Sequence, residues 1–386
     1  MMHRAGAALT IVASLFGGLL FTGACSSFGG EDVAATPEAG ADALDDRGAP
    51  SACTLEYVDD PAAKPDDKCG PGGAAVSLST DPLHCGACGH RCVGDVCQDG
   101  MCLRGEISLS APVTLAQVHG AMAYVVRNSG QVFALDLPLS QESAPFTAPI
   151  SGEAQRLDFD ATHVYVSTAV EQIRFARDPG TKDDLELPPG APATGRFALG
   201  DTSWFYAWPS GVARMKKGSA APPLVLPRTG VIDVVAKGDE AFWLEETTGG
   251  TEIHSFTKAA AQLESRIATA KEAKAAAVDA THVYFMDIGA RQLRRVKHDG
   301  GNSESVASEA AASVQTDVFV DGEFVYWTAD RGSVDGWVLM RVSKCGGLPL
   351  MLAKDLAQLS KLSADERFIY VVNRSGATGN LFRFPK

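Results

Sequence analysis

The sequence is short of basic residues: 34 Lys and Arg stand against 47 Asp and Glu, and the formal net charge is -13. Nucleic acids and anionic lipid headgroups both attract proteins through positive patches, so this balance argues against either as a partner. The sequence also lacks an H-E-x-x-H pair, a phosphate-binding Gly-rich loop and a G-x-S-x-G elbow. It therefore predicts no catalytic residue, no metal site and no cofactor.

Long apolar runs are equally scarce, and the only one lies at the N-terminus. It spans residues 7–21 behind Arg4, which is shorter than the roughly 20 residues that a membrane helix needs. Residues 1–24 therefore read as an export signal peptide. The small residues before Cys25 resemble a bacterial lipobox, in which that cysteine carries the lipid. Thr22 stands where Leu is usual, so cleavage after Ala24 to give a secreted protein remains the alternative. Either way the protein is extracytoplasmic, and the lipobox implies a membrane anchor in a bacterial cell envelope.

Residues 25–50 are mostly Ala, Gly, Pro, Asp and Glu. A stretch with so few aromatic or branched side chains cannot bury enough apolar surface to offset the entropy of ordering it. The acidity is concentrated around this segment, since residues 25–103 hold fourteen acidic and four basic side chains. We interpret residues 25–50 as a flexible acidic linker.

A cysteine-rich module follows over residues 51–103. So many cysteines in a short exported segment indicate a disulfide scaffold, because such a segment lacks an adequate apolar core. A zinc site is the alternative, because Cys85 and Cys88 lie two residues apart beside His84 and His90. The disulfide candidates are the seven module cysteines and one from the later sequence: Cys53, Cys69, Cys85, Cys88, Cys92, Cys97, Cys102 and Cys345.

The run DPLHCGACGHRCVGDVCQDGMC at residues 81–102 resembles the cysteine-rich motif of plant stigma-specific proteins, which also occurs in predicted bacterial lipoproteins. The resemblance covers residues 68–102. It implies a further cysteine near Ala75, which this sequence lacks. The module is therefore left with an odd number of cysteines. A bridge from the module to Cys345 would pair all of them if Cys25 is lipidated, whereas one free thiol in each domain is the alternative.

Residues 104–386 contain a repeat. The hexapeptide DATHVY occurs at 160–165 and 279–284, and looser copies recur every 37 to 44 residues. That interval is the length of one four-stranded propeller blade. The fold class is therefore all-β, a seven-bladed β-propeller preceded by the small disulfide-rich module. The copies align on their first aromatic residues, Tyr124, Tyr165, Phe205, Phe242, Tyr284, Tyr326 and Tyr370.

Two features of the repeat give testable expectations. Residues 259–279 have the composition of a helix, but the repeat register requires the outer strand of one blade and the first strand of the next, so we expect strands. The last unit has no fourth strand, while an additional strand at 105–110 precedes the first unit. Because a closed ring removes exposed sheet edges, we expect residues 105–110 to complete the last blade.

The copies VYWTAD at 325–330 and VYFMDI at 283–288 resemble the blades of YWTD and NHL-like propellers, among them those of low-density-lipoprotein receptors. The resemblance implies extracellular binding of proteins or peptides, although YWTD propellers have six blades. Bacterial virginiamycin B lyases are seven-bladed propellers and give the enzymatic comparison. No set of His and Glu in this sequence can be placed on their motif, so no catalytic residue is carried over.

Propeller ligands usually meet the face that carries the loops between the second and third strands. The longest such loops are expected at 245–252, 328–336 and 373–380. They supply the ligand-face candidates Asp330, Arg331, Asp335, Trp337 and Arg374. His163 and His282 occupy one repeat position, which favours a structural role for both.

Two classes of function remain. The first is a surface-tethered binding or scaffold protein for an unknown protein, peptide or glycan; the second is a propeller-type lyase or hydrolase acting on an envelope or extracellular substrate.

Overall fold

The computed structural model describes most of the propeller and a small part of the cysteine-rich module. Within it, the chain divides into units of Met1–Asp46 and Arg47–Lys386, and every described residue belongs to the second. The predicted signal peptide and linker lie outside the described residues. The described residues are 76–81, 84–85, 97–98, 100–102, 105–107, 109–137, 141–143, 145, 150–168, 170–176, 182–184, 195–218, 223–256, 264–308, 317–332, 336–359, 361–375 and 378–386.

All regular elements in these residues are β-strands, which confirms the predicted all-β class. The described part of the chain contains no helix that could cross a membrane. One small sheet belongs to the cysteine-rich module and pairs β1 (Cys97–Gln98) with β2 (Met101–Cys102).

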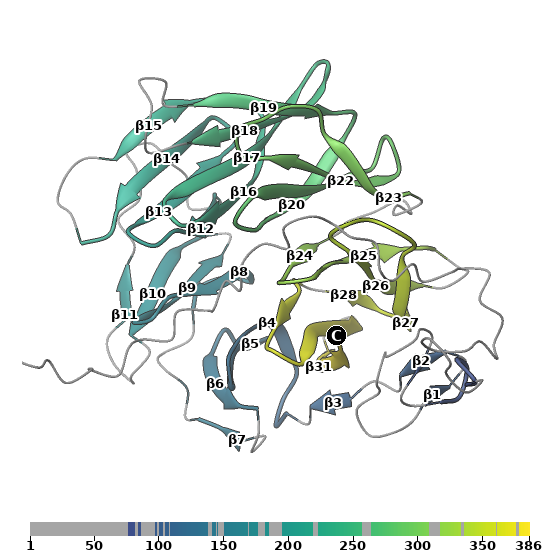
Figure 1. Ribbon diagram of the computed structural model, residues 1–386. Coiled ribbons are helices and arrows are strands. Elements are labelled where there is room, and N and C mark those ends of the chain that lie inside the picture. Colours follow the sequence, from purple (N-terminus) through teal and green to yellow (C-terminus); the bar gives the residue numbers. More distant parts are fainter. Residues whose placement is uncertain are drawn as a thin grey trace, which may run out of the picture. The chain divides into compact units, whose positions relative to one another are not determined.

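Seven further sheets are the blades of a β-propeller, as predicted (Figure 1). In each of the first six, four consecutive strands pair antiparallel in chain order. Blade 1 consists of β4 (Val113–His119), β5 (Met122–Arg127), β6 (Val132–Asp136) and β7 (Gln141–Glu142). Blade 2 consists of β8 (Ala154–Phe159), β9 (His163–Thr168), β10 (Gln172–Ala176) and β11 (Lys182–Asp184). Blade 3 consists of β12 (Arg196–Leu199), β13 (Ser203–Trp208), β14 (Gly211–Lys216) and β15 (Leu224–Pro227).

Blades 4 to 6 repeat this order. Blade 4 consists of β16 (Val231–Lys237), β17 (Glu240–Thr247), β18 (Gly250–Phe256) and β19 (Ser265–Ala270). Blade 5 consists of β20 (Ala273–Val278), β21 (His282–Asp287), β22 (Gln292–Lys297) and β23 (Glu304–Ser308). Blade 6 consists of β24 (Val318–Val320), β25 (Phe324–Asp330), β26 (Trp337–Ser343) and β27 (Leu350–Leu356).

Blade 7 draws on both ends of the repeat region, as expected. Its strands are β28 (Gln358–Leu359), β29 (Ser363–Ala364), β30 (Phe368–Ser375), β31 (Thr378–Pro385) and β3 (Gly105–Ile107). The strand β3 pairs antiparallel with β31 and places Ile107 opposite Leu381. Ile107 is 5% exposed and packs into a core shared with blade 1. The ring is therefore closed by strand pairing as well as by packing between blades.

The described part of the helix-prone segment, from residue 264 on, contains two strands and no helix. Ser265–Ala270 is the outer strand β19 of blade 4, and Ala273–Val278 is the inner strand β20 of blade 5. The three alanines at 275–277 are buried at the centre of the ring. Small side chains suit a position where inner strands converge, and this packing outweighs helix propensity.

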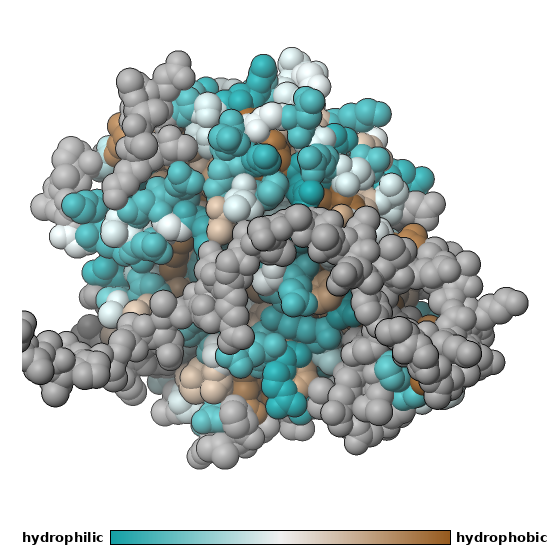
Figure 2. All heavy atoms as spheres, in the orientation of Figure 1, coloured by the Kyte–Doolittle hydropathy of each residue, from teal (hydrophilic) through white to brown (hydrophobic). Residues whose placement is uncertain are grey.

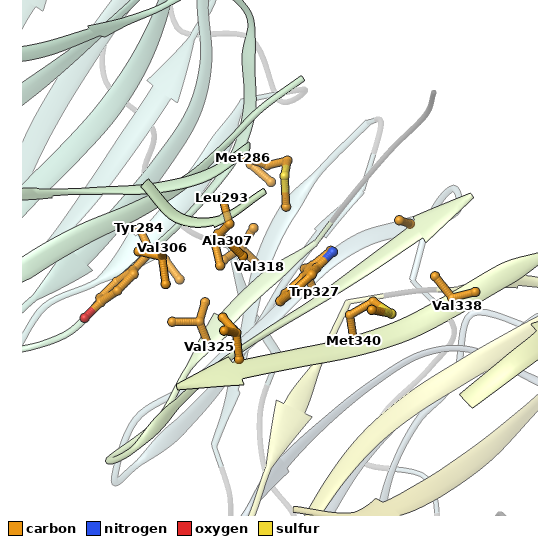
Figure 3. Close-up of a cluster of buried hydrophobic side chains, with 14 residues drawn as sticks. Tyr284, Met286, Leu293, Val306, Ala307, Val318, Val325, Trp327, Val338 and Met340 are labelled. Atoms are coloured by element: carbon orange, nitrogen blue, oxygen red, sulfur yellow. The ribbon is translucent and has the colours of Figure 1, made fainter. Parts of the chain in front are cut away.

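Apolar cores lie between neighbouring blades. Figure 3 shows the one between blades 5 and 6, where Trp327 of β25 packs among Met286, Leu293 and Met340. Trp327 is fully buried. The exterior differs: Figure 2 shows mainly hydrophilic side chains over blades 3 to 5, with apolar ones scattered singly.

The expected long loops were wrong in two of three cases. Strands β17 and β18 extend to Thr247 and from Gly250, so only residues 248–249 separate them. Strands β30 and β31 leave only residues 376–377 between them. The polar residues at these ends pair across hairpins. Only the connection after Asp330, which ends before Trp337, is a longer loop.

Candidate functional site

A cavity of about 900 Å³ occupies the centre of the ring and is lined by residues from all seven blades. Most of its wall comes from the inner strands. In blades 1, 2, 4 and 5 these strands carry a β-bulge near their first residues. A bulge inserts one residue and re-aims the side chains that follow. Arg156 and Asp233 each come directly after such a bulge.

Charged side chains line this channel at one repeat position. In every blade, the residue nine positions before the first aromatic faces the cavity. Blades 1 and 5 place Leu115 and Ala275 there, and the other five blades place a charge. We call these five residues the charged ring: Arg156, Arg196, Asp233, Asp317 and Lys361.

Two arginines of the charged ring share one carboxylate. Arg196 Nη1 donates to Asp233 Oδ1 over 3.1 Å, and Arg156 Nη1 lies 3.5 Å from the same oxygen. Arg156 also donates to the Val234 carbonyl at 3.3 Å. The Asp233 and Arg156 side chains are 10% and 13% exposed, whereas that of Arg196 is 55% exposed. Arg196 therefore presents the accessible cation of this group.

The two remaining members of the charged ring are Asp317 and Lys361, and the pKa of each is shifted from its usual value. Burial raises the pKa of Asp317, although Lys361 and a hydrogen bond from the Leu362 amide oppose that shift. Burial also lowers the pKa of Lys361, and the positive charge of Arg156 lowers it further. Both shifts favour the neutral forms of these two groups.

A second hollow, of about 430 Å³, lies between blades 1 and 2. It is lined by the turn Arg127–Gly130 and shares Thr114, Glu153 and Ala154 with the channel wall. The two spaces therefore adjoin, so that a ligand in the channel can continue outward along this groove.

The predicted ligand-face residues take different positions. Trp337 lines the channel. Asp330 pairs with Trp337 across the hairpin and accepts a hydrogen bond from the Gly332 amide, and the Arg331 amide donates to the Gly336 carbonyl. Asp335 lies outside the described residues. For Arg374 the backbone is described, and it pairs with Gln358 and Gly379.

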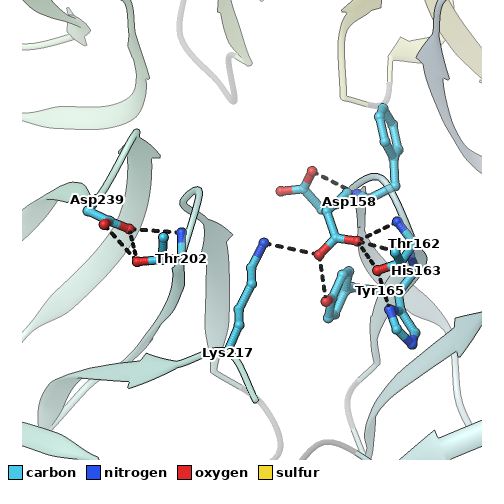
Figure 4. Close-up of polar contacts among 9 residues, drawn as sticks. Asp158, Thr162, His163, Tyr165, Thr202, Lys217 and Asp239 are labelled. Carbon is cyan, nitrogen blue, oxygen red and sulfur yellow. Dashed lines mark hydrogen bonds and ion pairs between the residues drawn. The ribbon is translucent and has the colours of Figure 1, made fainter. Parts of the chain in front are cut away.

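The repeated hexapeptide builds a contact between blades, which we call the Asp clamp (Figure 4). Asp160 accepts hydrogen bonds from the Thr162 and His163 amides and from the Tyr165 hydroxyl. Lys217 of blade 3 reaches across and lies 3.0 Å from Asp160 Oδ2.

Equivalent aspartates make the same amide and tyrosine contacts in three other blades: Asp279, Asp321 and Asp365. His163 and His282 bond the hydroxyl of the preceding threonine. This local contact explains their recurrence and supports the structural role expected for them.

The cysteine-rich module contributes one described disulfide, Cys85–Cys97. Cys85 therefore carries no thiolate, which removes it from the zinc alternative. Cys345 is also disulfide-bonded. No group of three or more His, Cys, Asp or Glu in the described ranges is arranged to hold a metal ion. Cys53, Cys69, Cys88 and Cys92 lie outside the described residues.

No family model matches the chain, and no curated protein matches its sequence. Solved structures are similar in fold. A streptogramin B lyase has a TM-score of 0.56 at 10% identity, over 73% of this chain and 97% of the lyase. A catalytically inactive virginiamycin B lyase from Staphylococcus aureus with quinupristin has a TM-score of 0.55 at 10% identity, over 73% and 99%. The computationally designed protein Ika8 has a TM-score of 0.51 at 13% identity, over 75% and 88%. At these identities the likeness establishes the propeller fold alone.

Sequence reasoning missed the charged ring. The repeat is recognised by its aromatic residues, which are similar in every copy. The position nine residues earlier holds Leu, Arg, Arg, Asp, Ala, Asp and Lys. No consensus appears there because sign and size differ between blades. A search for charge at positions that should face the centre of a propeller would have found it.

Proposed function

We propose that this chain is an extracytoplasmic binding protein, tethered to a membrane by a lipid on Cys25, and that its central channel holds a polar ligand. The charged ring is the observation that supports this proposal. Ionisable side chains at one level of a closed ring would cost free energy if the channel served only to close the fold, because the largely buried charges of Arg156 and Asp233 must be desolvated. A polar ligand that pairs with them offsets that cost.

Native mass spectrometry of the protein purified from its own cells tests the binding proposal. A ligand held in the channel should appear as an added mass that is released on unfolding. Lys361→Met should reduce its occupancy several-fold, whereas Lys354→Met, at an exposed position of β27, should retain it. Thermal melting must show both variants folded. Equal occupancy in wild type and Lys361→Met would place the ligand elsewhere, and a bare mass for the wild type would refute the proposal.

A propeller-type lyase or hydrolase is the second candidate, because Asp317 and Lys361 of neighbouring blades line the same channel. A lysine and a carboxyl that face one cavity are groups that could act as base and acid. The ligand found by native mass spectrometry can be used to distinguish the two functions. An enzyme should convert it during incubation with fresh protein at catalytic amounts, whereas a binding protein should return it with unchanged mass.

A further inference from the structure

We infer that Arg196 is the anchor for a ligand carboxylate, and that the ligand of the channel is a short peptide with a free C-terminus. This inference rests on the binding function proposed above. It follows from the charges around Asp233, the exposure of Arg196, the hydrogen bonds that hold its backbone and the adjoining groove.

The charge count favours a single negative charge. The cavity wall as a whole carries as many basic as acidic side chains, but the group around Asp233 holds two arginines against one carboxylate and so has one excess positive charge. Arg156 and Arg196 share the one carboxylate of Asp233, and Arg196 is the exposed member of the pair. A monoanion at Arg196 therefore balances this group of three residues, whereas a phosphate dianion would exceed the local positive charge and face the Asp233 carboxylate. A guanidinium group also matches the planar, two-oxygen shape of a carboxylate.

Arg196 stands on a fixed piece of backbone. The Gly195 amide donates to the Tyr206 hydroxyl at 2.8 Å, and the Gly195 carbonyl accepts hydrogen bonds from Ser167 and Gln172. A Cβ on Gly195 would lie 2.3 Å from the Tyr206 ring, so only glycine fits there. Because little backbone freedom is lost on binding, an arginine held in this way is preorganised for a ligand.

Asp233 and Arg156 act as positioning residues behind Arg196. Asp233 holds one amino group of the Arg196 guanidinium at 3.1 Å. Arg156 holds Asp233 in turn, and its guanidinium lies 5.8 Å from the ring centre of Phe197, the neighbour of Arg196. The rest of the half-exposed guanidinium of Arg196 is left for a ligand carboxylate in the channel.

A peptide fits the rest of the site better than an acidic sugar. The channel wall also carries the carboxyl groups of Glu153 and Asp158, which suit the ammonium and amide N–H groups of a peptide. Trp337 adds an aromatic surface to the same wall. The adjoining groove between blades 1 and 2 lets an extended chain continue outward from the channel. A cavity of about 900 Å³ is of the size that holds a small organic ligand or a few residues.

Titration calorimetry on the full chain tests the anchor with three probes: a mixed-sequence tripeptide library with free C-termini, the same library amidated, and trigalacturonate. The wild type should bind the free-acid library at least tenfold more tightly than the amides. Arg196→Gln should abolish that difference, and Arg196→Lys should restore part of it. Arg266→Gln is the matched control, because Arg266 is 58% exposed and pairs with Glu252 at 2.8 Å outside the channel. It should bind as the wild type does.

The outcomes separate this inference from the binding function. Equal affinity for acids and amides, or wild-type binding by Arg196→Gln, would overturn the anchor. Preference for trigalacturonate over the peptides would overturn the peptide assignment. If none of the probes binds while native mass spectrometry still finds a retained ligand, the inference fails and the binding function stands. If no ligand is retained either, both fail.

Discussion

The ammonium group of Lys344 in blade 6 lies 2.7 Å from Oδ2 of Asp279 in blade 5. Their side chains are 14% and 16% exposed, so solvent screens this pair only in part. Lys217 and Asp160 repeat the contact between blades 3 and 2, and Lys386 and Asp321 repeat it between blades 7 and 6. The Asp clamp therefore joins a turn of one blade to the next blade at three places in the described ring.

Breaking one clamp should destabilise the propeller measurably. Lys344→Met removes a charged hydrogen bond to a largely buried carboxylate, which is worth about 1.5–3 kcal/mol. We expect the melting temperature to fall by several degrees in a calorimetric scan. Lys297→Met, at an exposed end of β22, is the control and should change stability by about 0.5 kcal/mol at most. Equal melting of the two variants would contradict a role for the clamp.

The clamp aspartates should make the protein sensitive to acid. Burial alone raises the pKa of Asp160, but hydrogen bonds from Thr162, Lys217 and Tyr165 lower it below the usual range overall. The pKa of Asp279 is lowered in the same way, chiefly through Lys344. A folded-state pKa below the unfolded value of about 3.9 contributes stability above that pH, and the contribution is lost as pH falls through the folded value.

Melting temperatures between pH 2 and pH 6 test this sign. The wild type should lose stability as pH drops below about 4. The double variant Asp160→Asn and Asp279→Asn should start less stable at pH 6 and lose less on acidification. Asp299→Asn, in an exposed turn, should keep the wild-type slope. An unchanged slope in the double variant would show that the two carboxyls are not responsible.

The sequence predicted those features of the fold that recur in every blade. The aromatic of each second strand recurs because it packs between blades, as Tyr284 and Trp327 do, and it gave the blade count and the closing strand. The same register predicted strands within residues 259–279 against local helix propensity, because the repeats before and after require an outer and a first strand there. Loop ends could not be predicted: Thr247 and Ser375 extend their strands since hairpin pairing outweighs their polarity.

The site was less predictable than the fold. Trp337 was predictable as a ligand-face residue because it follows a long loop, and it lies in the channel wall. Arg196 could not be predicted as a site residue, because its neighbours in sequence form no motif. Its importance comes from Asp233, which lies 37 positions later and one blade away. A contact between two blades at one level appears only when the repeat is folded into a ring.

We predict that Cys345 bridges the propeller to the N-terminal quarter of the chain. Cys345 is disulfide-bonded, and Cys85 and Cys97 are bonded to each other. All other cysteines precede residue 103, and β2 of the module contacts β27, the strand that follows Cys345 in the chain. Peptide mapping without reduction should find Cys345 linked to a peptide from 51–103. A free Cys345 thiol in freshly purified protein would contradict the bridge.

Lipid attachment at Cys25 remains a prediction from the residues around it. Cells given a clickable fatty acid should label the wild-type protein, and Cys25→Ser should remove the label and release the protein from membranes. Ser26→Ala is a suitable control, because it leaves the cysteine and the residues before it in place. Labelling that persists in Cys25→Ser, or an unlabelled wild type, would favour the secreted alternative.

Closure by β3 is the contact on which the channel depends, because a charged ring at one level requires that blade 7 meets blade 1. Ile107 lies opposite Leu381 and is buried in the core between those blades, while Glu106 on the same strand is exposed. Ile107→Ala should therefore cost about 2–5 kcal/mol, and Glu106→Ala should stay within about 0.5 kcal/mol.

A shortened chain provides a stronger test of the same closure. A chain that begins at Val113 leaves β31 with an unpaired edge, so it should melt far lower than one that begins at Leu103 or aggregate on purification. Loss of the channel ligand should accompany loss of the strand, since the ring can then open between blades 7 and 1. Equal stability of the two shortened chains would mean that packing between blades alone holds the ring shut, and that the pairing of Gly105–Ile107 with β31 adds nothing.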